Sequence, residues 1–467
     1  MHTLENRWLY EAGVLKYYGM RNRPNLLKNT LRVPKKLRSV FAALPKTLTK
    51  EEMKQLSSWL EAGIVVEEAL KKTTPRSLEE AVFCRSCVAN DFMIPGLEFN
   101  QAGDCPMCQS VEVTAAFTSV LPVRKTFEHA SKSRFDIALF YTGGKDSSYL
   151  LYYLSKVLKL RVLALTWEIP FMSDSARQSI EAAKVRCPNV EFVTRKMNDA
   201  DLRRLYRDLY ARAGNTCACP SLAYILFFPD LVAERVPYFV AGNEPAQMLN
   251  LYFNRFAPPL AFSERVHKRL LMLTNVFRVL TLRPPLKSGQ MQSLVTMKQL
   301  AYGDPWFKRW SSYDHEVLQH ILASFDTVPH LLTPLKRAIK KASRSGKVPA
   351  FVHIDMADIA LKETYDWHHV KQIITEHLGW VGPDKDKGLH TSCKIERCKD
   401  FTQFRRFYDM ESQMIPFSAI ELSVASQEKH IDKAQAMKEI RKHLGFCLEG
   451  VLECQIMDAY LAGESTS

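Results

Sequence analysis

One stretch decides the fold: Asp136-Ile-Ala-Leu-Phe-Tyr-Thr-Gly-Gly-Lys-Asp-Ser-Ser148, followed at once by Tyr149-Leu-Leu-Tyr-Tyr-Leu-Ser-Lys156. Its first seven residues form an apolar run between a charge and two glycines, which predicts a buried strand. Gly143 and Gly144 predict a turn, because glycine adopts positive φ at little cost and lets a ligand approach the backbone. The stretch therefore predicts a strand, a glycine turn and a helix in immediate succession.

The predicted helix begins close to the turn. Ser147 and Ser148 are N-cap candidates, and the apolar residues from Tyr149 onward have helical spacing. Free backbone N–H groups and the positive end of the helix dipole would then face one point, where an anion is stabilised. Lys145 adds a full positive charge beside that point. This arrangement favours a phosphate chain as the ligand.

The turn resembles the PP-loop signature, SGGxDS, of the ATP pyrophosphatases, with Thr142 in place of the first serine. It has neither the GxxxxGK[ST] spacing of a P-loop nor the GxGxxG of a dinucleotide fold. PP-loop enzymes cleave ATP between the α- and β-phosphates, transfer AMP to a substrate oxygen and release pyrophosphate. The resemblance implies an ATP site at Tyr141, Thr142, Gly143, Gly144, Lys145, Asp146, Ser147 and Ser148.

Three of these residues are catalytic candidates. Lys145 would stabilise charge on the pyrophosphate leaving group, which phosphoryl-type transfer requires. Phosphates would repel the Asp146 carboxylate unless a cation intervened, which indicates a role in binding Mg²⁺. Ser147 would offer its hydroxyl and its backbone N–H to the same phosphate oxygens.

Strands and helices alternate after residue 136. Further strands are expected at 161–168, 190–195 and 237–244, and helices at 175–185 and 199–213. This βαβα alternation predicts an α/β fold, a parallel sheet with helices on both faces. Under the PP-loop resemblance, this would be the adenine nucleotide alpha hydrolase-like fold.

Ligands of such sheets bind beyond the carboxyl ends of the strands. One of these ends carries Thr166 and Trp167, where PP-loop relatives hold adenine, largely through the main chain. Another carries Gly242 and Glu244. Glu244 is either a second acid or substrate contact, or a solvated loop carboxylate. We expect the strand ends to converge on one crevice.

Two CxxC pairs precede the predicted strand. Cys84 and Cys87 are separated by seventeen residues from Cys105 and Cys108. Two such pairs at this distance fit a Cys₄ zinc ribbon, since tetrahedral Zn²⁺ favours four soft ligands. A metal with four protein ligands has no open coordination position, so a structural Zn²⁺ is expected. The alternative is four free thiols.

A CxC pair, Cys217 and Cys219, falls in a loop between two predicted helices near the crevice, and both residues are further catalytic candidates. They could carry sulfur, exchange disulfides or, with Cys393 or Cys398, bind an iron–sulfur cluster. They are also compatible with two small residues that happen to be thiols.

Length and composition indicate a globular protein of two or three domains, with 467 residues of which 46% are hydrophobic. The longest apolar stretches are far too short for a membrane span, and the N-terminus has no apolar signal segment. Eleven cysteines without such a signal indicate a reducing compartment. We therefore expect a cytoplasmic protein.

Five regions are expected along the chain: a basic helical module at 1–80, the zinc ribbon at 81–110, the PP-loop domain at 130–250, a helical insertion at 251–380 and a C-terminal helical region at 381–467. The net charge of +14 is unevenly placed. Residues 1–50 contain eleven Lys/Arg against two Glu, and residues 336–347 contain six. Either cluster could bind nucleic acid or an anionic substrate, or be a solvated basic face.

The ribbon and the PP-loop together resemble the N-acetyl sugar amidotransferases of surface-polysaccharide biosynthesis. Gly242-Asn-Glu-Pro245 and Leu378-Gly-Trp380 are also similar to that family. The resemblance implies adenylation of a carbonyl-type oxygen, followed by attack of a nitrogen nucleophile. The sequence has no glutaminase signature, so ammonia would come from a separate glutaminase. Residues 1–80 and the segment after 245 depart from the family pattern, which leaves the acceptor substrate open.

Two other readings remain. The PP-loop and the many cysteines are also similar to tRNA 2-thiolation enzymes, in which a sulfur-donor protein and Cys217/Cys219 would be central. The chain could instead be a non-catalytic ATP-binding regulator that holds nucleic acid on a basic face. The pair Lys145/Asp146 argues against the regulator, because a pure binder has less need of both.

Overall fold

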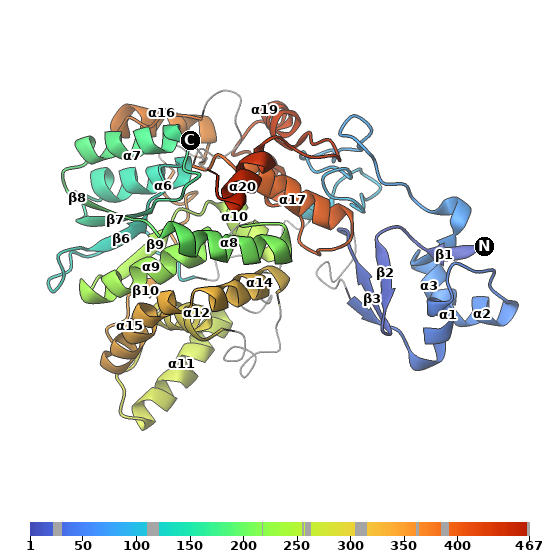
Figure 1. Cartoon of the computed structure of the whole chain (residues 1–467), viewed down its shortest axis with the longest axis horizontal. Helices are drawn as coiled ribbons and strands as arrows, with labels where there is room; N and C mark the ends of the chain where they lie inside the picture. Colours follow the sequence, from blue (N-terminus) through green and yellow to red (C-terminus); the bar gives the residue numbers. More distant parts are fainter. Residues whose placement is uncertain are drawn as a thin grey trace. The chain divides into compact units, whose positions relative to one another are not determined.

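The structure is a computed structural model that describes residues 1–21, 30–109, 121–216, 218–254, 256, 263–303, 315–360, 364–383 and 392–464. The chain forms two compact units. The first consists of Met1–Val111, Asp400–Gln427 and Lys433–Gly450, and the second of Glu112–Lys399, Glu428–Asp432 and Val451–Ser467. Figure 1 shows the elements of both.

A five-stranded parallel sheet forms the centre of the second unit. Its strands are β6 (Ile137–Phe140), β7 (Val162–Trp167), β8 (Val190–Arg195), β9 (Tyr238–Ala241) and β10 (Ala350–Phe351). They lie in the order β10-β9-β6-β7-β8, and every neighbouring pair is parallel. All residues of β6 and β7 are buried, as expected for continuous apolar strands covered on both faces. The predicted α/β fold is confirmed.

Helices cover both faces of this sheet (Figure 1). One layer contains α6, α7 and α16, and the layer on the other face includes α8 and α9. The helices of the second unit are α6 (Lys145–Tyr152), a π-helical turn (Tyr153–Val157), α7 (Asp174–Arg186), α8 (Asp199–Ala213), α9 (Cys219–Ala233), α10 (Pro245–Phe253), α11 (Glu264–Leu280), α12 (Gln290–Tyr302), α14 (Glu316–Ser324), α15 (Leu332–Ser345), α16 (Trp367–Leu378) and α20 (Glu453–Ala462). Two short 3-10 helices (Phe325–Thr327 and Pro329–Leu331) join α14 to α15. Among the described residues, no helix combines the length and the apolar character needed to cross a membrane.

The strand order reverses direction at β6. The chain continues from β6 to β7 on one side and later returns to β9 on the other side of β6. In doubly wound sheets, ligands bind at this reversal, beyond the carboxyl ends of the two strands. The order therefore places the ligand crevice between the ends of β6 and β9.

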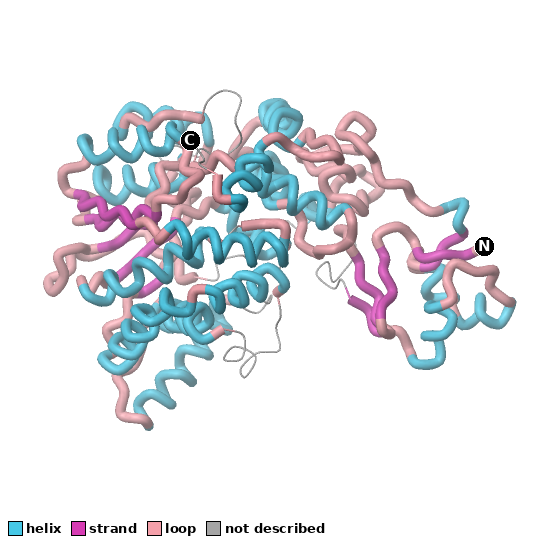
Figure 2. Tube along the Cα trace, in the orientation of Figure 1, coloured by secondary structure: helices cyan, strands magenta, loops and turns pink. Residues whose placement is uncertain are grey.

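The region expected as a helical insertion, 251–380, is only partly one. Its helices α11, α12, α14 and α15, which Figure 1 labels, are drawn in cyan at the same places in Figure 2. However, β10 pairs with β9 in the sheet, and α16 packs against α6. A two-residue strand carries too little periodicity to be found in the sequence. The sheet domain thus takes residues from well beyond 250.

The first unit contains more strand than predicted. Residues 1–80 were expected to be helical, and this is wrong for much of the segment. It contains β1 (His2–Leu4), β2 (Trp8–Glu11), β3 (Val14–Tyr17), β4 (Thr30–Arg32) and β5 (Val65–Glu67), besides the short helices α1 (Arg38–Ala42), α2 (Lys50–Gln55) and α3 (Ser57–Glu61) and two 3-10 helices (Lys35–Leu37 and Glu68–Leu70). β2, β3 and β4 form an antiparallel sheet, and β1 pairs with β5. The physical reason is a tight turn at Ala12 and Gly13, both with positive φ, which joins two β-prone runs.

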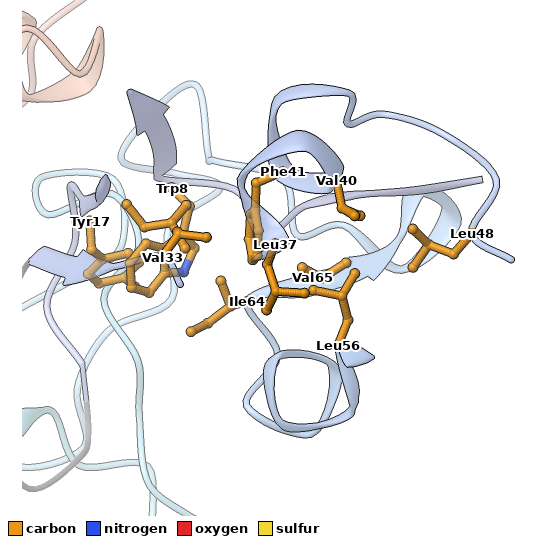
Figure 3. Close-up of a cluster of buried hydrophobic side chains, with 11 residues drawn as sticks. Trp8, Tyr17, Val33, Leu37, Val40, Phe41, Leu48, Leu56, Ile64 and Val65 are labelled. Atoms are coloured by element: carbon orange, nitrogen blue, oxygen red, sulfur yellow. The ribbon is translucent and has the colours of Figure 1, made fainter. Parts of the chain in front are cut away.

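This module has its own hydrophobic core (Figure 3). The buried side chains come from both the strands and the helices, and include Trp8, Leu15, Tyr17, Phe41, Leu56 and Ile64. Thr49 caps α2: its hydroxyl accepts from the backbone N–H of Glu52, whose carboxylate accepts from the N–H of Thr49. Local capping and burial by neighbouring elements therefore both stabilise these short helices.

Later segments complete the first unit. They contain α18 (Phe417–Gln427), α19 (Lys433–Glu439), a π-helical turn (Ile440–Leu444) and part of α17 (Glu396–Tyr408), while the earlier α4 (Pro106–Gln109) contains Cys108 of the second CxxC pair. Arg7 from the N-terminal module is buried, donates a hydrogen bond to the carbonyl of Tyr18 and lies 4.9 Å from the ring centre of Phe407. Burial lowers the pKa of Arg7 to about 10. This member of the N-terminal basic cluster is thus an internal residue.

Candidate functional site

α6 begins directly after the glycine turn. Gly143 has a φ of +74°, and Gly144 is the N-cap residue in an extended conformation. A Cβ at position 143 would lie 2.6 Å from the carbonyl oxygen of Ala176, so conformation and space both require glycine. The prediction that Ser147 or Ser148 is the N-cap is wrong, because the backbone enters the helix immediately after Gly144.

The first turn of α6 presents backbone donors to the crevice. The N–H groups of Lys145, Asp146 and Ser147 have no carbonyl four residues earlier in the helix. The Ser147 hydroxyl accepts a hydrogen bond of 3.2 Å from the N–H of Thr142 and lies 3.2 Å from the Thr142 hydroxyl. These contacts tie the helix start to the end of β6. The free N–H groups of a helix start in this geometry are suited to an anion.

Gly242, just after β9, packs on this turn. A Cβ at this position would lie 2.8 Å from both the Cα and the N atom of Ser147. Contacts this short do not occur, so only glycine lets the end of β9 approach the first turn of α6. The close approach brings Glu244, two residues later, over the helix start.

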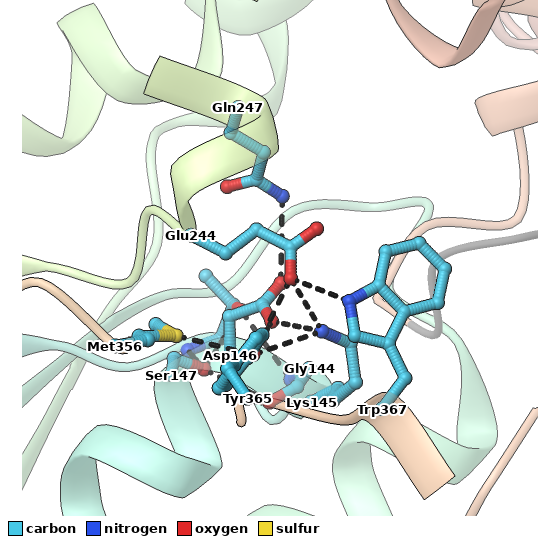
Figure 4. A network of polar contacts seen from close by, with 10 residues as sticks. Gly144, Lys145, Asp146, Ser147, Glu244, Gln247, Met356, Tyr365 and Trp367 are labelled. Atoms are coloured by element: carbon cyan, nitrogen blue, oxygen red, sulfur yellow. Dashed lines mark hydrogen bonds and ion pairs between the residues drawn. The ribbon is translucent and has the colours of Figure 1, made fainter. Parts of the chain in front are cut away.

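A charged network lies over this first turn, with Lys145 at its centre (Figure 4). The Lys145 Nζ lies 2.9 Å from Oε2 of Glu244, and it also pairs with Oδ1 of Asp146. The side chains of Lys145 and Asp146 are about nine-tenths buried, and that of Glu244 is fully buried. Two carboxylates therefore face one ammonium group in a site that has little contact with water.

Tyr365 and Trp367 hold Glu244 in place. The Trp367 indole N–H donates to Glu244 Oε2 at 2.8 Å, and the Tyr365 hydroxyl donates to the same oxygen at 3.3 Å. The Lys145 Nζ lies 4.6 Å from the ring centre of Trp367. Glu244 is thus part of a buried network, and the reading as a solvated loop carboxylate does not hold.

The electrostatics keep Lys145 charged. Burial by itself would lower the pKa of Lys145, but the negative charges of Asp146 and Glu244 outweigh it, and the pKa lies above its ordinary value. Burial, together with the same two carboxylates, raises the pKa of Tyr365 well above its ordinary value. Tyr365 therefore remains a hydrogen-bond donor at all physiological pH values.

A cavity of about 210 Å³ opens beside the network. Its walls come from the helix start, the end of β9 and three later segments. The lining residues are Thr142, Gly144, Lys145, Asp146, Ser147, Gly242, Gln247, Trp367, Lys371, Trp380, Pro383, Ser392 and Glu396. The cavity lies beyond the carboxyl ends of β6 and β9, where the strand order places a ligand.

The predicted cofactor residues divide into two groups. Thr142, Gly144, Lys145, Asp146, Ser147 and Gly242 line the cavity, and Glu244 contacts Lys145. Tyr141, Gly143, Ser148, Thr166 and Trp167 are not among the lining residues. The Tyr141 and Ser148 hydroxyls lie 3.5 Å apart in the core, and the Thr166 hydroxyl donates to the carbonyl of Tyr141. The expectation that the strand ends converge on one crevice therefore holds for β6 and β9, whereas no described residue from the ends of β7 and β8 lines this cavity.

Several side chains at the cavity and the charged network were not predicted from the sequence. Gln247 donates to Asp146 at 3.4 Å, and Trp380 donates from its indole N–H to the carbonyl of Gly143 at 3.1 Å. Trp380 belongs to a Leu-Gly-Trp sequence similar to a known family, which was a usable signal. Tyr365, Trp367 and Lys371 had none, because only the packing of α16 against α6 brings them to the site.

The structure describes three of the four cysteines that were candidates for sulfur transfer or a cluster. Cys217 lies outside the described residues. Cys219 starts α9, and its Sγ lies 3.8 Å from the Lys399 Nζ. Cys393 follows Ser392 of the cavity wall, and burial raises the pKa of its thiol. Cys398 contacts a different thiol, that of Cys454, with 2.6 Å between the sulfur atoms.

The four CxxC cysteines converge in the first unit. Their sulfur atoms all lie within 4.8 Å of one another, and the distance is 3.7 Å for both Cys84–Cys108 and Cys87–Cys105. The backbone N–H of Cys105 donates to the Cys84 sulfur at 3.2 Å. Four thiolates around one point fit Zn²⁺ or an iron–sulfur cluster. In the described ranges no other group of three or more His, Cys, Asp or Glu side chains is so arranged.

Comparison with known proteins adds little to this geometry. No family model and no curated protein matches the chain. Among solved structures it is similar to the U34-tRNA thiolase NcsA from Methanococcus maripaludis with its [4Fe-4S] cluster, at 15% identity over 56% of this chain and 86% of that one. The TM-score is 0.23, too low for the match to bear on function.

Proposed function

We propose that the second unit cleaves ATP to AMP and pyrophosphate, and uses the AMP to activate a carbonyl-type oxygen of its substrate. One observation carries the proposal: the open first turn of α6 faces a cavity at the strand-order reversal, with Lys145 and Asp146 on its wall. This supports a phosphate chain as the ligand. Lys145 would offset the charge that develops on the departing pyrophosphate.

The charge balance of the site supports a divalent cation. The carboxylates of Asp146 and Glu244 are both largely buried and lie at the cavity or beside it, and phosphates bound there would repel them unless a cation intervened. Mg²⁺ typically binds through one or two carboxylates together with substrate phosphates. We infer that Asp146, with Glu244 beside it, holds Mg²⁺, which would polarise the phosphates when bound.

The reaction would proceed in two steps. The substrate oxygen attacks the α-phosphorus, a new O–P bond forms, and the bond to the β-phosphate oxygen breaks as pyrophosphate leaves. A nitrogen nucleophile then attacks the activated carbon, and AMP departs with the former carbonyl oxygen. Trp367 and Trp380 line the cavity and would limit access of water, which competes for the adenylate. The end of β7, at Thr166 and Trp167, remains our proposed position for adenine.

Nitrogen transfer is the first choice for the second step, with ammonia supplied by a separate glutaminase. Sulfur transfer is the second candidate, and a specific observation favours it: Cys393 adjoins the cavity wall, and Cys219 lies close to the Lys399 ammonium. Sulfur transfer would use one of these thiols as its thiolate, the form of sulfur that reacts. The nitrogen route needs no such thiolate.

The four-cysteine site would hold one structural Zn²⁺. The observation that supports this is the closed set of four sulfur atoms from residues only 24 positions apart. Such a site contributes folding energy and leaves no coordination position for a substrate.

The test of the function is a product analysis. The protein is incubated with Mg²⁺, an ammonium salt, a panel of carbonyl compounds and ATP that is labelled in both its α- and its γ-phosphate, and the labelled products are separated. AMP and pyrophosphate that depend on one acceptor are the expected result. ADP and phosphate as products would refute the proposal. The variant Lys132→Met, which changes an exposed lysine of the same unit, is the control for Lys145→Met.

A further inference from the structure

The C-terminal half of α11 exposes a group of large apolar side chains. The exposed fraction is 61% for Leu273, 64% for Phe277, 77% for Leu280 and 95% for Leu282 just after the helix. Met272 and Val276 are likewise more than half exposed. In Figure 1, α11 extends beyond α12 and α15 on the side away from the sheet. We call these six residues the apolar tip.

The opposite side of α11 is largely polar over the C-terminal half of the helix and faces the protein. Arg278 is 5% exposed, and its guanidinium donates to the carbonyls of Pro284 at 2.7 Å and Ser343 at 2.8 Å. Asn275 donates to the carbonyl of Leu286 at 2.8 Å and accepts from its N–H at 2.7 Å. A surface helix normally turns its apolar side inward and its polar side outward. These hydrogen bonds fix α11 in the reverse orientation.

The segments around the apolar tip are basic. Apart from the buried Arg278, residues 263–303 contain six Lys/Arg against one acid, Glu264, and α15 with Lys347 contains six and no acid. The bond from Arg278 to Ser343 joins the end of α11 to the end of α15, so Arg344 and Lys347 lie at the same end of the unit as the tip. Both of these side chains and that of Arg283 are exposed.

The combination of charge and apolar surface selects the partner. A second copy of this chain would bring the same positive charges against one another. The phosphates of a nucleic acid would bind the cations, but they would not bury six exposed apolar side chains. A membrane surface with anionic headgroups satisfies both, because apolar side chains enter the boundary of the acyl chains while Lys and Arg contact the headgroups.

We propose that the apolar tip of α11 inserts into the surface of a membrane that contains anionic phospholipids, with the basic side chains of α15 against the headgroups. The helix lies on the membrane and does not cross it, in accord with the lack of any spanning helix in the described ranges. This inference is independent of the reaction at α6.

Vesicle flotation with the full-length protein tests the proposal. Vesicles of phosphatidylcholine and phosphatidylglycerol in equal parts are compared with vesicles of phosphatidylcholine alone. We expect flotation with the anionic vesicles and its weakening by salt, and we expect Leu273→Asp/Phe277→Asp to reduce the bound fraction by roughly tenfold or more. Arg344→Glu/Lys347→Glu should reduce it less and weaken the salt dependence. Val185→Asp, at a side chain 85% exposed on α7, should bind like the parent protein.

Two results would overturn the proposal. The first is flotation that is absent, or that the double Asp variant leaves unchanged while circular dichroism shows an intact fold. The second is a concentration-dependent dimer, measured by sedimentation, that the double Asp variant dissociates and anionic vesicles do not compete for. That result would assign the tip to contacts between copies of the chain.

Discussion

The four-cysteine site and the site at the start of α6 are built in opposite ways. The cysteines lie 24 positions apart at most, and they complete a ligand shell among themselves. Lys145, by contrast, meets Glu244 from 99 positions away and Tyr365 from 220 positions away. One ion would satisfy the first set, while the second opens on a cavity. A closed local set stabilises structure, whereas an open set from distant segments is suited to chemistry.

We expect the largest effect on stability when one cysteine of the four-cysteine site is removed. Cys105→Ser removes one of four ligands, and structural Zn²⁺ in small domains contributes about 10–16 kcal/mol. A typical domain is stable by only about 5–15 kcal/mol, so the first unit should unfold or precipitate. Elemental analysis should give one zinc per parent chain and none in the variant. Cys447→Ser, which changes an exposed thiol of the same unit, should keep both zinc and solubility. Freshly purified parent protein without zinc would refute the assignment.

Lys145→Met should affect both turnover and folding of the second unit. The change leaves Asp146 and Glu244 as two buried carboxylates without their cation, and breaking a buried pair in this way costs about 3–5 kcal/mol. Urea unfolding should show this loss, and AMP formation should fall below detection. Lys132→Met should change neither quantity. A variant of unchanged stability would mean that the carboxylates are not both charged in the folded protein.

Asp146→Asn should separate the two effects. The remaining pair of Lys145 and Glu244 is balanced, so stability should change little, whereas the loss of a cation ligand should lower kcat by roughly 10²–10³-fold. Steady-state AMP formation and urea unfolding measure the two quantities. The control is Asp174→Asn, at the first turn of the neighbouring helix α7. Full activity of Asp146→Asn would remove Asp146 from the catalytic site.

Tyr365→Phe should have an intermediate effect. It removes only the hydroxyl that donates to Glu244 and Asp146, and a hydrogen bond to a charged group contributes about 1.5–3 kcal/mol. The free energy of unfolding should fall by this amount. Tyr153→Phe, whose hydroxyl donates to the exposed carbonyl of Lys125, should cost far less. Equal losses in the two variants would contradict the view that the buried network holds Glu244.

The smallest effect is expected at the CxC pair. On the nitrogen route, Cys217→Ser/Cys219→Ser should retain ammonia-dependent product formation within about twofold, as for most substitutions outside a site. The purified protein should be colourless. A brown protein with cluster absorption, or complete loss of activity in the double variant, would favour sulfur transfer, because a serine hydroxyl cannot replace a thiolate.

Local patterns accounted for what the sequence could predict. The strand, turn and helix around Gly143, the bounds of β8 and α8, and the spacing of the four cysteines all depend on neighbours along the chain. The hairpin at Ala12 and Gly13 could also have been found, since two β-prone runs flank a two-residue turn with glycine. The start of α6 was misplaced because serine is a common N-cap, whereas here glycine conformation sets the helix start.

Long-range packing accounts for what the sequence could not predict. Tyr365 and Trp367 look like ordinary aromatic residues before a helix, and only the packing of α16 on α6 brings them to Glu244. The inverted orientation of α11 is likewise invisible, because its polar side faces the protein through hydrogen bonds to backbone carbonyls elsewhere. A helical period is the same whichever side faces outward.

The late position of β10 has a consequence for the synthesis of the chain. The ribosome releases β6 to β9 well before Ala350–Phe351, which complete the sheet, and before Tyr365 and Trp367, which hold Glu244. A nascent or truncated chain that ends earlier would contain the whole glycine-turn signature with its β9 edge unpaired and its buried charges unsupported. Such edges are prone to aggregation. The network at the start of α6 can therefore assemble only after residues 350–367 have left the ribosome, and not when the glycine-turn signature does.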